Sequence, residues 1–211
     1  MSEWTGEVEP VSIRGMSMEE KRSRILETAI ELAEKGGFEN VRLRDVAAQA
    51  EVALGTLYKR FPSKESILIA ALEMEAEKLE KRMSKAPSEG NDALDRVIVF
   101  FEGASRTLFR KPNLGRAVLR ALTSGDEELT EQVAMFHQRM TNMIVASLRG
   151  SLITSIFPEA SNDELIVAFI MQQQWFAGLV GWMGGLITRQ MVIDQLRITL
   201  SIVMRGLEKE T

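Results

Sequence analysis

The chain has 211 residues, of which 45% are hydrophobic, and this is enough to bury a substantial core. It contains no cysteine and one histidine, which excludes a disulfide framework, a thiolate metal site and a histidine-rich metal site. The formal net charge of −4 argues against a protein that coats nucleic acid non-specifically, and the lack of cysteine suits the cytoplasm, where we expect the protein.

The N-terminal residues predict an arm followed by a capped helix. Residues 1–16 are acidic and polar, without a basic segment ahead of an apolar run, so we expect a flexible arm rather than a secretion signal. Ser17 and Glu20 have the spacing of a capping box and predict a helix start. Apolar residues then recur three and four apart until Gly36 and Gly37, which we expect to end this helix.

The segment 41–64, VRLRDVAAQAEVALGTLYKRFPSK, predicts two short helices around a tight turn. The first, over 43–50, places its apolar residues on one face, and residues 51–52 form the turn. The second spans about 53–60, buries Leu57, and ends before Pro62, because proline cannot continue the hydrogen-bond ladder. This arrangement is typical of a helix-turn-helix whose second helix enters the DNA major groove.

The same segment is locally basic on an acidic chain. A charge cluster alone is usually a solvated face, but here it coincides with a helix-turn-helix pattern and therefore favours contact with DNA phosphates. The cations of the segment are Arg42, Arg44, Lys59, Arg60 and Lys64, and they face only Asp45 and Glu51.

A longer helix is predicted from Ser63, a candidate cap, to about Met83. Its apolar half should pack on the preceding helices, so that a tilt of its far end would move them. Breaker residues at 86–91 then mark the best internal boundary. We therefore expect an arm over 1–16, a DNA-binding domain over 17–62, and a connector helix with a C-terminal domain over 63–211.

Beyond this boundary the pattern remains helical. Breaker dipeptides and tripeptides separate apolar-periodic segments, and no strand pattern or internal repeat interrupts them. We expect an all-α fold in which a three-helix helix-turn-helix domain precedes a helical domain for ligand binding and dimerisation. The predicted helices span about 92–110, 113–123, 127–151, 162–186 and 188–208.

The stretch 165–186 carries no charged residue and is long enough to cross a membrane. Glutamines at 172–174 and glycines at 178, 181, 184 and 185 argue against a span, so we expect a buried or subunit-facing helix and no membrane partner. The last helix is also too apolar for a lone surface helix. Two such helices from each of two chains would form a four-helix interface, and this predicts a homodimer.

The segment GTLYKRFPSKESIL resembles the signature of the TetR family of bacterial transcriptional regulators, and GGFENVRLRDVAAQAEV matches the preceding family stretch. The resemblance covers about residues 24–72. Three positions depart from it: Arg42 and Ala53 replace capping residues, and Glu51 replaces a common turn glycine. It implies a homodimer, formed through the last two helices, that binds a palindromic double-stranded DNA operator. It also implies a small hydrophobic effector in the C-terminal domain.

Two segments, ENVRLRDVA and VALGTLYKRFPSK, are also similar to actinobacterial repressors of sterol catabolism, which implies a sterol, lipid or acyl thioester effector. The resemblance further places Arg44 where the family's first motif helix contacts DNA. Helical spacing exposes most of the second helix, where Tyr58 alternatively forms a partly buried brace for the next helix. The predicted DNA-binding residues are Arg42, Arg44, Leu54, Gly55, Thr56, Tyr58, Lys59, Arg60 and Lys64.

The C-terminal helices hold many large, adaptable side chains, and the family's habit of binding an effector there predicts a pocket among them. For any single residue a place in the plain core is the stronger alternative, and His137 is expected at the surface or at a pocket edge. The predicted ligand-binding residues are Phe101, Phe136, Met140, Met143, Met171, Gln172, Trp175 and Phe176.

Together these observations predict a ligand-responsive transcriptional regulator, in most of the family a repressor. Two alternatives stay open: a DNA-binding regulator without an effector, and a helical ligand-carrier protein. An enzyme is not expected, since the chain has no G-x-x-x-x-G-K-[ST] phosphate loop and no G-x-G-x-x-G after a strand. For the same reason we expect no cofactor.

Overall fold

The computed structural model describes residues 17–153 and 160–207, and these residues form helices and connecting turns with no strand. The all-α prediction is confirmed; the predicted arm at 1–16 lies outside the described residues. The helices are α1 (Met18–Asn40), α2 (Leu43–Gln49), α3 (Leu54–Arg60), α4 (Lys64–Met83), α5 (Ala93–Arg110), α6 (Pro112–Leu122), α7 (Thr130–Arg149), α8 (Asn162–Met183) and α9 (Arg189–Leu207), with a 3-10 turn at Glu127–Leu129.

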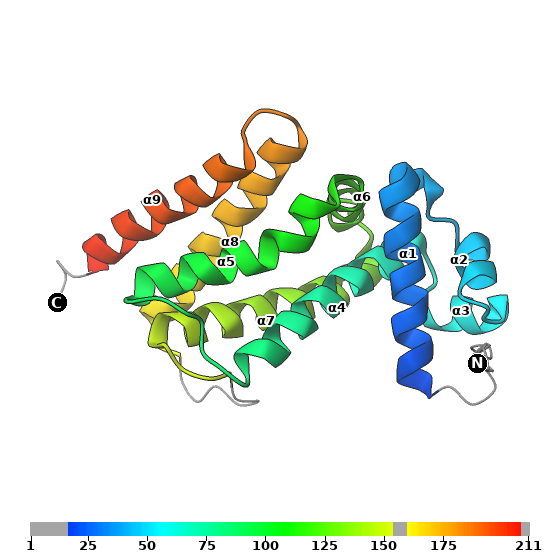
Figure 1. The fold of residues 1–211 in the computed structure, drawn as a ribbon, viewed down its shortest axis with the longest axis horizontal. Coiled ribbons are helices and arrows are strands. Elements are labelled where there is room, and N and C mark those ends of the chain that lie inside the picture. Colours follow the sequence, from blue (N-terminus) through cyan, green and yellow to red (C-terminus); the bar gives the residue numbers. More distant parts are fainter. Residues whose placement is uncertain (1–16, 154–159, 208–211) are drawn as a thin grey trace, which may run out of the picture.

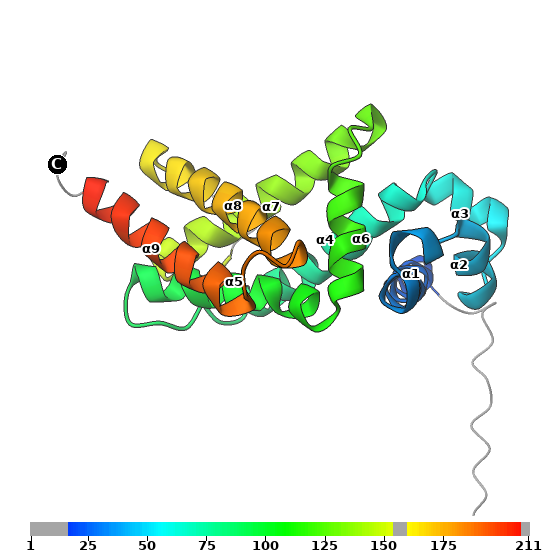
Figure 2. The same cartoon turned by 90° about the horizontal axis from the view of Figure 1, so that it is seen from above.

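The helices form an elongated molecule (Figure 1). Helices α1, α2 and α3 make a small head at one end, and α8 and α9 lie side by side towards the other end (Figure 2). Helix α4 runs from the head into the body, where α5, α6 and α7 pack around its length. The buried side chains of head and body form one continuous core.

Side-chain caps explain where the helices begin. The Ser17 hydroxyl accepts from the Glu20 amide at 3.2 Å, and the Glu20 carboxylate accepts from the Ser17 amide at 2.6 Å, as the sequence predicted. The same reciprocal pair forms between Ser161 and Glu164 at the start of α8. Ser63 caps α4 by accepting from the amide of residue 66.

Glycines end several helices, and the predicted C-terminal ends of α7 and α8 are too late because of them. Gly37 is left-handed (φ 68°) and breaks the regular part of α1, although one further helical turn follows it. Helix α7 ends at Arg149, and not at 151, because Gly150 is left-handed (φ 65°). Helix α8 ends at Met183, and not at 186: Gly185 is left-handed, and the Leu186 amide bonds back across the last turn.

Helix α8, which contains most of the charge-free stretch 165–186, is part of the bundle. Its length and mean hydropathy of 1.3 would suit a membrane span, but it packs between α7 and α9. A Cβ at Gly178 would lie 3.0 Å from Val192 Cγ1 of α9, and one at Gly181 would lie 3.4 Å from Ile187 Cδ1. The glycines therefore let the segment that follows α8 return closely along it within the same chain.

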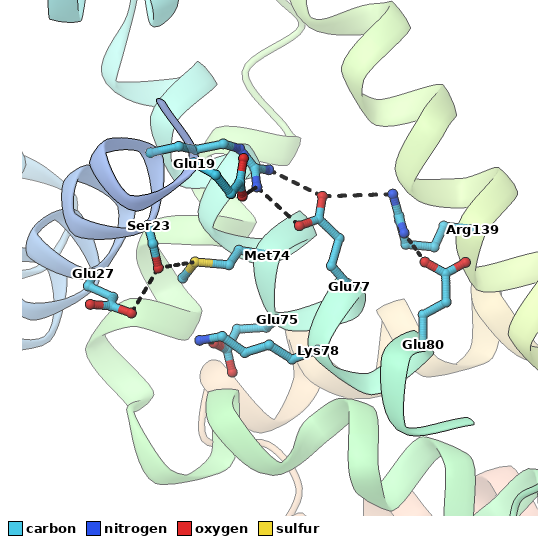
Figure 3. Close-up of polar contacts among 10 residues, drawn as sticks. Glu19, Ser23, Glu27, Met74, Glu75, Glu77, Lys78, Glu80 and Arg139 are labelled. Carbon is cyan, nitrogen blue, oxygen red and sulfur yellow. Dashed lines mark hydrogen bonds and ion pairs between the residues drawn. The ribbon is translucent and has the colours of Figure 1, made fainter. Parts of the chain in front are cut away.

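An ion-pair chain joins the start of α1 to the middle of the body through α4 (Figure 3). Arg22 of α1 donates to both oxygens of Glu77 at 3.1 and 3.2 Å, and Arg139 of α7 lies 3.8 Å from Glu77 while also pairing with Glu80. The buried neighbour Glu73 has its pKa raised by burial and by repulsion from Glu77. The two arginines thus balance an acidic stripe on α4.

Helix α6 provides a second link between body and head, whereas the sequence pattern predicted a link through α4 alone. It packs more extensively against α1 than α4 does. The Asn113 side chain donates to the Glu34 carbonyl at 2.9 Å, and the Leu114 amide donates to the Glu34 carboxylate at 3.1 Å. Further along α6, Arg120 pairs with Glu39 at 2.8 Å and lies over the Phe38 ring. A shift of α6 is therefore transmitted directly to α1.

Candidate functional site

Helices α2 and α3 form the predicted helix-turn-helix. Val46, Ala47 and Leu57 are buried in the core of the head, which leaves the opposite faces of both short helices free. Arg42 and Ala53 stand at the two N-cap positions, and neither helix has a side-chain cap. The loss of both caps, predicted from these departures, is confirmed.

The turn between the two helices holds a residue in a strained conformation. Glu51 is left-handed (φ 55°), a conformation that costs a residue with a Cβ about 1–2 kcal/mol and that glycine adopts freely. Its carboxylate lies 2.7 Å from the Arg24 guanidinium of α1. The ion pair thus ties the turn to the helix that braces it.

The outer face of α2 and α3 is basic and mostly unoccupied. Tyr58 is 47% exposed, which favours a surface ring over the alternative of a buried brace. No ion pair within the described residues engages the cations of this face, so they are free for another partner. The exposed predicted residues are Arg42, Arg44, Gly55, Thr56, Tyr58, Lys59 and Arg60.

Two predicted DNA-binding residues lie differently. Leu54 is half-buried and packs against the core of the head, because it begins α3 next to the turn. Lys64 lies 3.1 Å from Glu39 and 4.0 Å above the Phe38 ring, so its ammonium group already has partners from the end of α1. Leu54 is therefore less exposed than its helical spacing predicted, and the predicted phosphate contact of Lys64 would compete with its contacts to α1.

Gly55 leaves the backbone of α3 uncovered by any side chain at its position. A Cβ built on it would meet nothing within 4 Å. The backbone of the recognition helix is therefore uncovered at this position, and a DNA strand could approach it closely.

A cavity of about 150 Å³ lies in the body between α4, α6, α7 and α8. This is far above the about 10–15 Å³ that one water needs. Of the predicted ligand-binding residues, Phe136, Gln172, Trp175 and Phe176 line it. The lining is otherwise Leu72, Leu108, Gly115, Val118, Leu119, Leu122, Val133, His137, Gln173, Leu179 and Met183.

The other predicted ligand-binding residues do not line this cavity. Phe101, Met143 and Met171 are fully buried in the core, where Phe101 packs 5.8 Å from the Trp175 ring. Met140 lines a neighbouring cavity instead. Phe101, Met143 and Met171 thus occupy core positions, which is the alternative that the sequence left open, and their predicted ligand contacts stay a prediction that this cavity does not support. The α6 lining was missed because its apolar spacing does not distinguish a cavity wall from core.

The cavity has one polar end. His137 Nδ1 lies 3.0 Å from the Gln172 side-chain oxygen, and the Gln172 amide donates to the Thr141 hydroxyl at 2.9 Å. His137 is exposed and lines the cavity, as expected for a pocket-edge histidine. The remainder of the wall is mainly apolar, so the cavity suits an apolar molecule with few polar groups.

The outer faces of α8 and α9 form a third notable surface, which is apolar and uncovered. On α8, Phe169 is 62% exposed, and on α9, Ile198 and Ile202 are 59% and 57% exposed. Leu165, Ile166, Val180 and Met191 are exposed on the same two helices. An apolar area of this kind on a soluble protein marks an interaction surface.

Comparison with known proteins identifies the helix-turn-helix region. Residues 25–71 match the model of the bacterial regulatory proteins of the tetR family. The HTH-type transcriptional repressor KstR of Rhodococcus jostii (strain RHA1) is 31% identical over 188 residues, which cover 89% of this chain and 84% of that protein.

Solved structures share the whole fold. A TetR transcriptional regulator from Rhodococcus sp. RHA1 has a TM-score of 0.75 at 22% identity and covers 91% of this chain and 99% of its own. Thermus thermophilus FadR, in complex with lauroyl-CoA, has a TM-score of 0.67 at 17% identity and covers 88% and 94%. The similarity to KstR extends from the head through most of the body. The chain therefore belongs to the TetR family of bacterial transcriptional regulators, which act by binding DNA and not as enzymes.

Proposed function

We propose that the protein is a cytoplasmic homodimeric repressor that binds a palindromic operator and leaves it when a small apolar effector fills the body cavity. Residues 17–62 would form the DNA-binding domain and 63–211 the effector and dimerisation domain. The observation that carries the proposal is the double role of α6, which lines the cavity and is hydrogen-bonded to α1 of the head.

The DNA-binding half rests on the free basic face of α2 and α3. Arg44 is assigned to base edges, and the Thr56 and Tyr58 hydroxyls are assigned to phosphates. Arg42, Lys59 and Arg60 add positive charge around them, so binding should weaken steeply as salt rises. Lys64 has a secondary role at most, because Glu39 and Phe38 already hold it.

The variant Gly55→Ala tests whether α3 approaches DNA closely, because it should raise the stability of the protein and lower its affinity for the operator. The protein should become more stable, by up to about 1 kcal/mol, because alanine favours a helix and its Cβ meets no protein atom. Operator affinity should fall at least tenfold, because the methyl group holds the DNA backbone away. Thermal unfolding and fluorescence anisotropy with the chain's own upstream DNA measure the two effects.

The matched control is Gly103→Ala on α5, which also replaces a helical glycine but lies far from the head. It should leave operator affinity unchanged in the absence of effector. If Gly55→Ala binds the operator as tightly as the unmodified protein, the proposed approach of α3 to DNA is incorrect.

The dimer half rests on the apolar outer faces of α8 and α9. Two copies related by a two-fold axis would bury these faces in a four-helix interface. A dimer also places two recognition helices on successive major-groove segments, which a palindromic operator requires.

For the effector to release the operator, it must bind more tightly to the dimer conformation whose two DNA-binding heads do not match the operator. A ligand with equal affinity for both conformations would not change their populations. A molecule that enlarges the cavity would displace α6 and, through Glu34, the end of α1. Acyl thioesters are the first class to test. The sequence similarity to repressors of sterol catabolism favours them, and a structure with the same fold was solved with lauroyl-CoA.

The variant Leu119→Trp tests the effector role. Leu119 is a half-buried lining residue of α6, so the larger ring should fill the cavity with little strain. We expect operator binding within about twofold of the unmodified protein but at least tenfold weaker response to lauroyl-CoA, measured as release of labelled operator. Val99→Trp, at an exposed position of α5, is the control.

This experiment also separates the alternatives. A regulator without an effector would bind the operator but show no release with any acyl thioester or sterol tested. A carrier protein would bind such ligands and ignore its upstream DNA even in low salt.

A further inference from the structure

A second cavity, of about 240 Å³, adjoins the first and differs from it in chemistry. It opens between α4 and α5, and Leu72, Phe136 and Trp175 line both cavities. Its rim carries cations from both helices, namely Lys78 and Arg82 of α4 and Arg106 and Arg110 of α5. The single carboxylate in its wall is Glu75.

The charge of Glu75 is already balanced within the protein. Lys78 lies 2.8 Å from its carboxylate, and the Thr107 hydroxyl donates to it at 2.6 Å. Burial alone would raise the pKa of Glu75, but these two partners outweigh burial and lower it. Glu75 is therefore ionised and paired, and it does not neutralise the three arginines.

No ion pair links Arg82, Arg106 or Arg110 to an acidic group in the part of the chain that the structure describes. All three are exposed, and they approach the cavity from two facing helices. Guanidinium groups bind carboxylates and phosphates through paired hydrogen bonds, so this rim is suited to an anion with several oxygens.

We propose that the second cavity binds the anionic head of an amphipathic effector whose apolar part occupies the first cavity. Three unpaired arginines favour a head with two or more negative charges, as in a phosphate. The inference rests on the proposed effector role of the first cavity. It adds a separate site, with the ligand class that this site selects.

The shared wall provides a route between the two cavities. Trp175 is held in place because its indole N–H donates to the Ser105 hydroxyl at 2.9 Å. Leu72 and Phe136 are apolar side chains without such a restraint, so a change of rotamer at either is the step that would connect the two cavities. Gly103 also lines the second cavity, and its missing side chain leaves space on the α5 side, where a Cβ would contact Leu79 at 3.4 Å.

The test compares ligands of equal chain length and different head charge: dodecyl phosphate and dodecanoic acid below their critical micelle concentrations, and dodecan-1-ol below its solubility limit. Isothermal titration calorimetry measures their affinity for the full chain. The test variant combines Arg82→Gln, Arg106→Gln and Arg110→Gln. Its control combines Lys81→Gln, Lys85→Gln and Arg205→Gln, which remove the same charge from exposed positions that line neither cavity.

We expect the unmodified protein and the control variant to bind dodecyl phosphate at least tenfold more tightly than dodecan-1-ol, with dodecanoic acid between them. The test variant should lose this preference and bind all three ligands alike. Raising the KCl concentration should weaken the binding of dodecyl phosphate by the unmodified protein and leave dodecan-1-ol unaffected.

The outcomes separate this inference from the proposed function. If the test variant keeps the preference for phosphate, or if inorganic phosphate alone binds equally well, the amphipathic head site is refuted while the first cavity keeps its effector role. If none of the three ligands binds the unmodified protein, the effector role fails and the head site fails with it.

Discussion

An Arg44→Ala variant is expected to lose both affinity for the operator and the ability to distinguish it from other DNA. Arg44 is exposed on α2 and has no ion pair within the described residues, so its removal leaves the fold intact. A good bidentate contact to a base discriminates by about 1–3 kcal/mol, which becomes about 2–6 kcal/mol for the two heads of a dimer. Anisotropy titrations with the operator and with a scrambled duplex, at physiological salt, measure this loss.

Tyr58→Ala provides the contrast, because a residue that contacts phosphate should weaken binding to both duplexes alike. Lys81→Ala, on the exposed side of α4 away from the head, controls for the loss of one positive charge. An Arg44→Ala protein that still prefers the operator as strongly as before would show that Arg44 does not contact the bases.

A variant with Phe169→Glu and Ile198→Glu is expected to be a folded monomer that no longer holds the operator. Both side chains lie on the uncovered faces of α8 and α9, so the substitutions do not disturb the core of one chain. In a two-fold dimer each charge would appear twice in an apolar interface, where burying an unpaired carboxylate costs several kcal/mol. Sedimentation velocity at micromolar concentration and operator titration measure the two losses.

The control for this variant carries Val99→Glu and Met135→Glu, which add the same charge at exposed apolar positions on α5 and α7. It should remain dimeric. A Phe169 and Ile198 double variant that stays dimeric would place the subunit interface elsewhere on the molecule.

The sequence predicted the helices well where local chemistry decides. The capping box at Ser17 and the stop at Pro62 depend on neighbouring residues, and both appear where expected. The ends of α7 and α8 were predicted too late. Periodicity continues across a left-handed glycine such as Gly185, so it does not show which of several glycines turns the chain.

Site residues were predictable where exposure alone matters. Helical spacing identified the free face of α3, including Tyr58. It did not reveal the partners of Lys64, because Phe38 and Glu39 come from another helix. It also did not separate Met143 and Met171 from the cavity lining, because a core position and a cavity wall have the same apolar character. Only the packing of distant helices leaves space beside one of them.

The hydrogen bonds between α1 and α6 limit how this regulator can be recombined with its relatives. A hybrid that joined residues 17–62 to a foreign body would separate Glu34 from the Asn113 amide and from the first free backbone amides of α6. The foreign surface would also have to replace Arg120 beside Phe38 and Glu39. A functional exchange of DNA specificity therefore has to transplant matched α6 positions together with the head.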